Sequence, residues 1–176
     1  MRSIIYHVAV TLDGYIAHSD HSATGFSFEG PHVTAFFEHL KTYDTVVMGR
    51  GTYEAGYQYG MKPGEAPYPT MRNYVFSQSL AIADSDRLKI VRAPWRDTVD
   101  MLKSESGSDI YLCGGGKFAG ALLAEGLIDR LRLKVAPVVF GSGIKLFEGK
   151  NTLQNFRLDA VVDYGNGVLL TEYSKA

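Results

Sequence analysis

Two glycine-rich segments carry residue types that can bind phosphate: Gly49-Arg50-Gly51-Thr52 and Gly114-Gly115-Gly116-Lys117. Glycine lets the backbone approach a ligand closely, and arginine offers a planar fork of donors that matches phosphate oxygens, while threonine adds a hydroxyl. A single glycine pair at a strand–helix junction is often only a tight turn, so each segment alone is weak evidence. Both nevertheless have the character of phosphate cradles.

The second segment also satisfies G-x-G-x-x-A, the fingerprint of dinucleotide-binding Rossmann domains, over residues 114–119. It lies late in the chain, however, and no acidic residue follows about 20 positions on, as that fold requires for the ribose. Residues 134–140, which occupy that place, are basic and apolar. We therefore expect no Rossmann domain, and the Walker pattern is missing from the sequence as well.

The elements that position these segments are short apolar runs typical of buried strands. One such run ends just before each glycine-rich segment, at residues 45–48 and 109–113. Further runs lie at residues 4–10, 73–76, 88–91 and 130–140. Helical spacing of apolar residues predicts a helix that begins at Pro31 and packs through Val33, Phe36, Phe37 and Leu40. Further helices are predicted at 97–103 and 118–127, and Thr52 is a candidate cap for another.

Strands that alternate with helices predict an α/β fold, with a mostly parallel mixed sheet and helices on both faces. The C-terminal residues 156–173 read as an antiparallel hairpin that turns at Asn166-Gly167. No linker divides the chain, so residues 1–176 are expected to form one domain. In such sheets ligands bind beyond the carboxyl ends of the strands, where both glycine-rich segments fall.

Composition excludes several classes of protein. Eighteen Lys and Arg residues nearly balance 19 Asp and Glu residues, so the net charge of −1 gives no attraction to nucleic acid or anionic lipid. The one cysteine, Cys113, excludes a disulfide framework and is expected to be a small buried hydrophobe. No targeting or membrane-spanning run is present, so we expect a cytoplasmic protein.

Histidines and acids do not form a metal site in the sequence. His18, Asp20 and His21 share a polar loop, but no second ligand cluster completes a coordination shell. His32 and His39 stand seven residues apart, which predicts a shared surface face of the first helix. His7 lies within the first strand and is expected to be packed and hydrogen-bonded rather than catalytic. No nucleophile–base arrangement is evident, so the catalytic residues are left open.

A set of motifs spread along nearly the whole chain resembles the dihydrofolate-reductase-like superfamily, a three-layer sandwich. The likeness is greatest to the reductase domain of the bifunctional riboflavin-biosynthesis deaminase/reductase and its stand-alone relatives. The motifs are Thr11-Leu12-Asp13-Gly14-Tyr15-Ile16-Ala17, Val46-Val47-Met48-Gly49-Arg50-Gly51-Thr52-Tyr53-Glu54, Gly114-Gly115-Gly116, Gly126-Leu127-Ile128-Asp129 and Pro137-Val138-Val139-Phe140-Gly141-Ser142-Gly143.

The resemblance implies an NADPH-dependent reductase, commonly a homodimer, with a cis peptide bond between the first two glycines of the triplet. NADH stays open as the alternative cofactor. The cofactor-binding residues that the resemblance implies are Ala9 and Ile16 at the nicotinamide, Gly49, Arg50, Thr52, Gly114, Gly115, Gly116 and Lys117 at the phosphates, and Ser77 at the adenosine 2′-phosphate.

Two positions depart from the resemblance. Gln78 follows Ser77 where relatives often have arginine, which weakens the expected preference for NADPH. Val33 falls where dihydrofolate reductases place the carboxylate that binds the pterin, so folate reduction is not expected. Val33, Phe36 and Tyr53 are instead assigned to the substrate pocket.

These observations predict an NAD(P)H-dependent reductase that transfers hydride to a carbonyl or imine of a small heterocyclic substrate. One alternative is the ribosylaminopyrimidine-phosphate reductase of riboflavin biosynthesis, although no deaminase domain with zinc ligands is attached. The alternative from another class is a dinucleotide-binding module without catalytic activity, which the missing carboxylate favours and the two glycine-rich segments disfavour.

Overall fold

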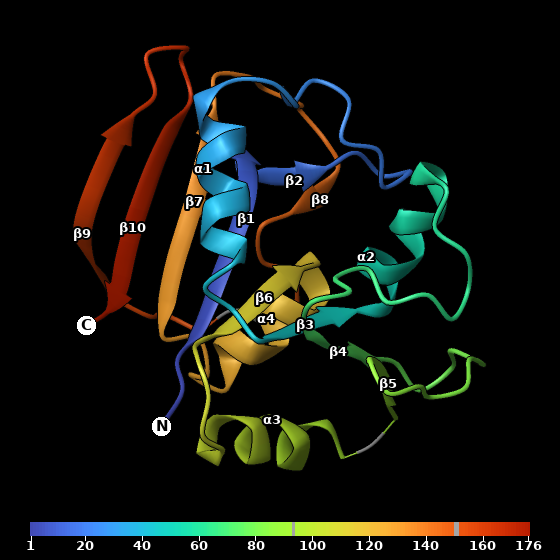
Figure 1. Ribbon diagram of the computed structural model, residues 1–176. Helices are drawn as coiled ribbons and strands as arrows, with labels where there is room; N and C mark the ends of the chain where they lie inside the picture. The colour runs from blue at the N-terminus through green and yellow to red at the C-terminus, as the bar shows by residue number, and fades with distance from the viewer. Residues whose placement is uncertain (93, 150–151) are drawn as a thin grey trace.

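A computed structural model describes residues 1–92, 94–149 and 152–176 and shows a three-layer α/β domain (Figure 1). Its central sheet has eight strands in the order β5-β4-β3-β6-β1-β7-β10-β9. Their bounds are β1 Ile4–Thr11, β3 Thr45–Gly49, β4 Arg72–Phe76, β5 Leu88–Val91, β6 Ile110–Gly114, β7 Arg130–Ala136, β9 Phe156–Asp163 and β10 Leu169–Lys175. A second, two-stranded sheet pairs β2 (Tyr15–Ala17) with β8 (Ile144–Lys145).

Neighbouring strands from β5 through β7 are parallel, whereas β10 is antiparallel to both β7 and β9. Strand β1 lies inside the sheet, between β6 and β7, and the hairpin β9–β10 forms one edge. The prediction of a mostly parallel sheet with an antiparallel C-terminal hairpin is therefore confirmed.

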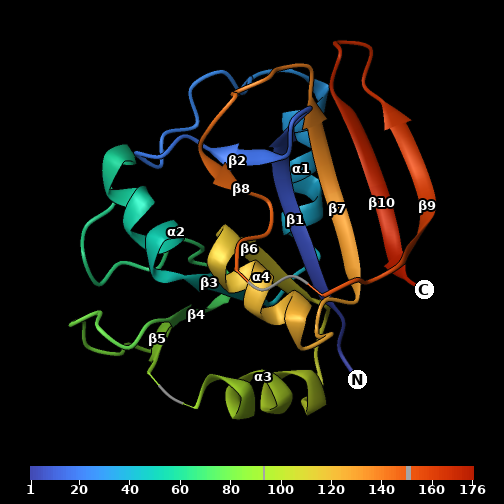
Figure 2. The same cartoon turned by 180° about the vertical axis from the view of Figure 1, so that it is seen from behind.

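Helices cover both faces of the sheet. On one face lie α1 (Pro31–Leu40), α2 (Arg50–Ala55) and the 3₁₀ turn Gly56–Tyr59; on the other lie α3 (Trp95–Ser104) and α4 (Gly116–Ala124). Figure 1 shows α1 in front of β1 and β7, and the reverse view in Figure 2 brings α4 to the front. Each face has its own apolar core, because strand side chains alternate between the faces: Leu112 of β6 packs with α4, and the adjacent Tyr111 packs towards α1.

Two helix–strand boundaries differ from the sequence prediction. Strand β7 ends at Ala136 instead of continuing to Phe140, because Pro137 has no N–H to donate to a neighbouring strand. Helix α2 begins at Arg50 with Gly49 as its N-cap residue, so Thr52 lies inside the helix and caps nothing. The short strands β2 and β8 were not predicted.

The buried face of α1 is also different from the predicted one. His32 is only 4% exposed, whereas Phe37, predicted to pack, is 58% exposed. The ring of His32 is held at both nitrogens, since Nε2 donates to the Ser27 carbonyl (3.1 Å) and Nδ1 accepts from the Asn166 amide (3.0 Å). The prediction that His32 and His39 share a surface face is therefore wrong: polar partners from distant loops bring His32 inside.

Candidate active site

The two glycine-rich segments pack against each other at the carboxyl ends of β3 and β6. A Cβ placed at Gly115 would lie 3.0 Å from the Thr52 hydroxyl oxygen, and one at Gly114 would lie 3.4 Å from it. A Cβ at Gly49 would meet the Phe118 side chain at 3.2 Å. These short distances explain why glycine is needed here. The peptide bond between Gly114 and Gly115 is cis, as the resemblance implies.

Arg50 joins the end of β3 to the loop that follows β4. Its guanidinium donates from Nε to Glu54 Oε1 (2.9 Å) and from Nη1 to Ser79 Oγ (2.7 Å). In the same loop, the hydroxyl of Ser77 accepts from the Leu80 N–H (3.1 Å) and so shapes the turn. The exposed Arg50 and partly buried Ser77, predicted from separate segments, therefore lie at one edge of the sheet.

The first turn of helix α4 follows directly on Gly114 and Gly115, whereas its own glycines, Gly116 and Gly120, pack against Lys145 and Glu148. Lys117 is exposed in the first turn, next to the cradle formed by Gly114 and Gly115. Gly116 instead faces the chain that follows β8, where an added Cβ would lie 2.3 Å from the Lys145 carbonyl oxygen. Its own carbonyl accepts from the Glu148 N–H (3.0 Å). Gly116 thus lets α4 pack closely against residues 145–148, whereas Gly115 packs against Thr52.

The loop after β1 is fastened by a carboxylate. Asp13 accepts from the Thr11 hydroxyl and from the N–H groups of Phe140 (3.2 Å) and Gly141 (2.7 Å), so it ties this loop to the one after β7. These hydrogen bonds, that of Thr11 foremost, hold the pKa of Asp13 below its usual range. Ala9 lies within β1, two residues before its end, and Ile16 is the middle residue of β2.

Beneath α1 lies a group of polar side chains packed around Phe36. The Phe36 ring contacts the His7 ring, with centroids 4.9 Å apart, and the Lys134 ammonium lies 3.6 Å from the Phe36 centroid. Burial lowers the pKa of Lys134 to about 8. Burial, with the neighbouring Lys134 and Arg132 cations, also keeps the pKa of His7 well below its usual value.

His7 is packed as predicted, but it is not hydrogen-bonded: neither ring nitrogen has a partner among the residues that the structure describes. On the adjacent strand, Cys113 contacts the Tyr68 hydroxyl through its sulfur (3.3 Å), and burial raises the pKa of the thiol. Buried polar groups are normally satisfied, so an unpartnered histidine here is a sign of a ligand site.

The other two residues assigned to the substrate pocket lie in different surroundings. Val33 is partly buried in the first turn of α1. Tyr53 is fully buried, and its hydroxyl accepts from the Gly64 N–H (2.9 Å) and lies 3.2 Å from the Glu65 carbonyl. The structure therefore places Tyr53 in the core, where it anchors α2, rather than on an open pocket wall.

The sequence profile of the RibD C-terminal domain matches residues 2–170, almost the whole chain. The chain belongs to the RibD C-terminal domain family. Among curated proteins of this kind, YwjB of Bacillus subtilis (strain 168) is 32% identical over 170 residues, which are 96% of this chain and 96% of YwjB. YyaP of the same organism is 29% identical over 181 residues, covering 98% of this chain and 94% of YyaP.

Solved structures share the RibD reductase-domain fold. A protein from Shewanella sp. PV-4 ascribed to riboflavin biosynthesis superposes with a TM-score of 0.80 at 22% identity, over 100% of this chain and 99% of the other. The diaminohydroxyphosphoribosylaminopyrimidine deaminase/5-amino-6-(5-phosphoribosylamino)uracil reductase of Thermotoga maritima superposes with a TM-score of 0.71 at 14% identity, over 99% of this chain and 57% of that longer one. The predicted dihydrofolate-reductase-like architecture is thereby confirmed.

One residue of this family member that the sequence analysis overlooked is Lys134. Arg132 and Lys134 alternate with Leu131 and Leu133 along β7, so one face of this strand is basic. Because α1 covers this face of β7, with the Phe36 ring against the Lys134 ammonium, the Lys134 side chain is half-buried although it is charged. The alternation was visible in the sequence, but the interior position of the strand was not.

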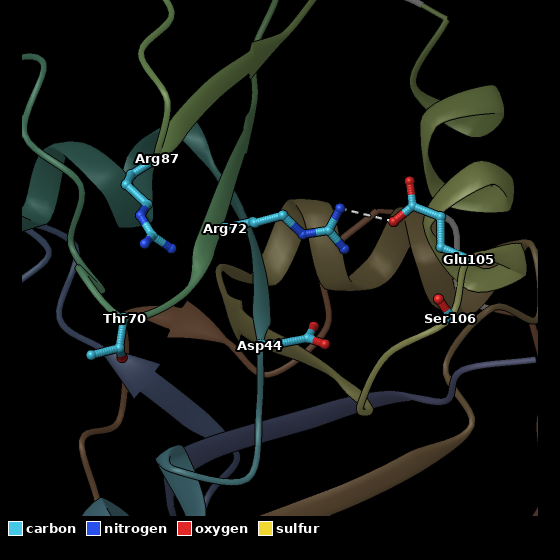
Figure 3. Close-up of a pocket in the computed structure, with 6 residues that line it drawn as sticks. All are labelled: Asp44, Thr70, Arg72, Arg87, Glu105 and Ser106. Atoms are coloured by element: carbon cyan, nitrogen blue, oxygen red, sulfur yellow. Dashed lines mark ion pairs between the residues drawn. The ribbon is translucent and has the colours of Figure 1, made fainter.

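A pocket of about 520 Å³ lies at the opposite edge of the sheet, lined by Asp44, Thr70, Arg72, Arg87, Glu105 and Ser106 (Figure 3). Arg72 is neutralised there by an ion pair with Glu105 (2.8 Å). Asp44 precedes β3 and Arg72 begins β4, so the pocket faces the amino ends of parallel strands. Ligands of such sheets bind at the carboxyl ends, and we do not assign the active site to this pocket.

Over residues 1–92, 94–149 and 152–176, no group of three or more His, Cys, Asp or Glu side chains is arranged to hold a metal ion. Within the same ranges, no helix is long and apolar enough to cross a membrane.

Proposed function

We propose that this protein is an NADPH-dependent reductase acting on a carbonyl or imine of a small heterocyclic substrate. The observation that carries the proposal is the packing of Gly49 and Thr52 against Gly114 and Gly115 at the carboxyl edge of the sheet. This arrangement exposes backbone to a phosphate chain, with Arg50 beside it. Membership of the RibD C-terminal domain family supports an oxidoreductase activity.

The residue types present at this edge support the choice of cofactor. A side chain at Gly115 would crowd the Thr52 hydroxyl, so the absence of a Cβ lets the two glycine-rich segments approach this closely. Arg50 and Lys117 supply cationic groups for phosphates, Ser77 supplies a hydroxyl for the 2′-phosphate, and the backbones of Ala9 and Ile16 would meet the nicotinamide. NADPH, when bound, supplies a hydride. The proposal also places the protein in the cytoplasm, where NADPH is available.

The first candidate reaction is the reduction of a ribosylaminopyrimidine phosphate. The Thermotoga maritima relative is named as a 5-amino-6-(5-phosphoribosylamino)uracil reductase, and a Corynebacterium diphtheriae structure named as pyrimidine reductase-like superposes with a TM-score of 0.69 at 14% identity, over 99% of this chain and 92% of that one. These names and the family match support a pyrimidine substrate, and a wider panel of carbonyl and imine compounds tests the general class.

A titration with NADPH followed by Trp95 fluorescence and by thermal shift tests the proposal. Hydrogen bonds to charged groups contribute roughly 1.5–3 kcal/mol, so Arg50→Ala is expected to weaken NADPH binding about 10- to 150-fold. The matched control is Arg157→Ala, which removes an exposed arginine paired with Asp159 (3.2 Å) on β9 and is expected to leave NADPH affinity unchanged.

The absence of a saturable response to NADPH or NADH at millimolar concentration would contradict the proposed reductase activity. Binding without turnover of any compound in the panel supports a non-catalytic dinucleotide-binding module.

The comparison of NADPH with NADH tests the role of Ser77. Gln78 offers no charge to the 2′-phosphate, so we expect the preference for NADPH to rest on Ser77 and Arg50. Ser77→Ala is expected to reduce the ratio of NADPH to NADH affinity, and an unchanged ratio assigns the discrimination to other residues.

We also propose a homodimer formed through the hairpin edge of the sheet. Strand β9 is the outermost strand, and Leu158, Val161 and Val162 on it are 52%, 52% and 43% exposed. Exposed apolar side chains along an unpaired edge strand favour a second copy of the chain as partner.

A further inference from the structure

Lys134 is a half-buried cation on an interior strand of the sheet, and the described residues provide no counter-ion for it. It lies on β7 in register with Ala9 of β1, and its Nζ stacks on the Phe36 ring at 3.6 Å. Among the described residues it has no ion-pair or hydrogen-bond partner, whereas Arg132, two residues earlier, binds both Glu172 and the Tyr43 hydroxyl (3.1 Å). A fold that provides a partner for one cation and none for the next leaves room for an acceptor from outside the chain.

The surroundings of Lys134 supply donors and weak acids but no free carboxylate. The ionisable groups that face it from the packed elements are His7 of β1, His39 of α1, Cys113 of β6, Glu172 of β10 and Arg132 of β7 itself. Glu172 is engaged by Arg132, and both nitrogens of His7 lack partners. The groups around Lys134 are therefore suited to a ligand that offers acceptor oxygens or nitrogens, and unsuited to a cationic one.

We propose that Lys134 is the proton donor of the reduction, and that the carbonyl or imine that is reduced binds beside its ammonium. This inference rests on the proposed function. Its geometric basis is the register pairing of Lys134 with Ala9, the strand position that the resemblance assigns to the nicotinamide. The hydride donor at Ala9 and the proton donor Lys134 would therefore lie at neighbouring positions of the adjacent strands β1 and β7, where both can reach one substrate.

The electrophilic carbon of the substrate gains a hydride, the π electrons of the C=O or C=N bond move to the heteroatom, and that atom takes a proton from Lys134 Nζ. Lys134 is left as a neutral amine and regains a proton from water. The substrate thus gains two electrons and two hydrogens, NADPH is oxidised to NADP⁺, and one proton is consumed from solution.

The state of Lys134 suits this role near neutral pH. Its pKa, lowered to about 8 by burial, leaves the amine protonated at pH 7 but more ready to release the proton than an ordinary lysine. Phe36 orients the ammonium through its ring face, without accepting a proton from it.

The first test is a direct titration of the Lys134 amine, with no substrate present. Lysines are ¹³C-dimethylated and followed by NMR, and the Lys134 signal is identified by its loss in Lys134→Met. We expect this signal to titrate near pH 8, and its apparent pKa to fall further when NADP⁺ saturates the protein, because the oxidised nicotinamide brings a positive charge close by. Titration with the bulk lysines, or no response in a protein that binds NADP⁺, overturns the inference. Failure to bind NADP⁺ at all overturns the proposed function and this inference with it.

The second test is the pH profile of NADPH oxidation with 5-amino-6-(5-phosphoribosylamino)uracil. Wild-type kcat is expected to fall tenfold per pH unit above about pH 8. Lys134→Met is expected to lower kcat about 100-fold and to lose this pH dependence, with NADPH affinity changed by less than about threefold. Lys134→Arg keeps the charge but does not release a proton in this range, so it is also slow. Lys89→Met, which removes an exposed lysine of β5, leaves the profile unchanged. A Lys134→Met protein that keeps both rate and profile refutes the assignment.

Discussion

Replacing Lys134 by methionine is expected to make the protein more stable at neutral pH while removing the proposed proton donor. Methionine has nearly the same length and fills the same space against Phe36, but it carries no charge that must lose its hydration. The effect is expected to depend on pH, because the lysine in the folded protein titrates at a different pH from the lysine in the unfolded chain.

The size of the effect follows from the pKa of Lys134, which burial lowers from 10.5 to about 8. A lowering of this size corresponds to about 3 kcal/mol of unfavourable free energy for the partly buried ammonium. At pH 6 the amine is protonated in both states, so Lys134→Met is expected to raise the free energy of unfolding by about 3 kcal/mol.

The sign of the pH dependence is opposite to that of an ordinary ion pair. Between pH 8 and pH 10.5 the folded protein has released the Lys134 proton while the unfolded chain still holds it. Wild-type stability therefore rises with pH in this window relative to that of the variant, and the difference between the two proteins disappears near pH 10.5.

Urea unfolding followed by Trp95 fluorescence, at pH 6 and again at pH 10, measures both quantities. Lys89→Met serves as the control, because that lysine is exposed and its nearest carboxylate, Asp84, is 3.9 Å away. A Lys134→Met variant that is less stable than wild-type at pH 6 refutes the reasoning. So does a difference in stability that is the same at both pH values.

Four further perturbations test other parts of the structure. Gly120→Ala would place a Cβ 1.8 Å from the Glu148 carbonyl oxygen, so we expect at least about 3 kcal/mol of destabilisation in chemical denaturation. Asp13→Ala is expected to remove a stabilisation that is present above the unfolded pKa of 3.8 and is lost as pH falls through the lower folded value; acid unfolding curves that coincide for the two proteins contradict this. Light scattering is expected to report twice the 19.4 kDa chain mass, and Val161→Lys on β9 is expected to return the monomer; a wild-type monomer at high micromolar concentration refutes the edge interface. Because Val33 offers no carboxylate where a protonated pterin would need one, dihydrofolate is expected to be a negligible substrate, and robust dihydrofolate-dependent NADPH oxidation contradicts this placement of Val33.

The parts of the structure that the sequence could predict are those specified by neighbouring residues. Apolar runs that end in glycine located β3 and β6, and the Asn166-Gly167 turn located the hairpin, because strand propensity and turn geometry act over a few residues. The strands β2 and β8 have three and two residues, too few to show a period, and the tie through Asp13 that organises the loops beside them joins positions 127 and 128 residues apart.

Burial of polar side chains was the part that could not be predicted. His32 is buried because Asn166, 134 residues later, accommodates its ring, and periodicity within α1 carries no record of that partner. Lys134 is unpaired because Glu172 binds Arg132 instead, a choice set by the antiparallel register of β10 on β7. Such outcomes depend on strand order, which a single sequence does not specify.

The interior position of β1 has a consequence for how the chain folds. The strand is synthesised before both of its neighbours in the sheet, β6 and β7, which lie at residues 110–136. The apolar residues of β1 therefore have no strand partner until about a hundred further residues have been synthesised. Contacts between positions so far apart in sequence also make folding slow. The same arrangement makes the first eleven residues the joint between two blocks of sheet, β5-β4-β3-β6 on one side and β7-β10-β9 on the other. A truncation that removes them would separate the glycine-rich edge from the strand that carries Lys134.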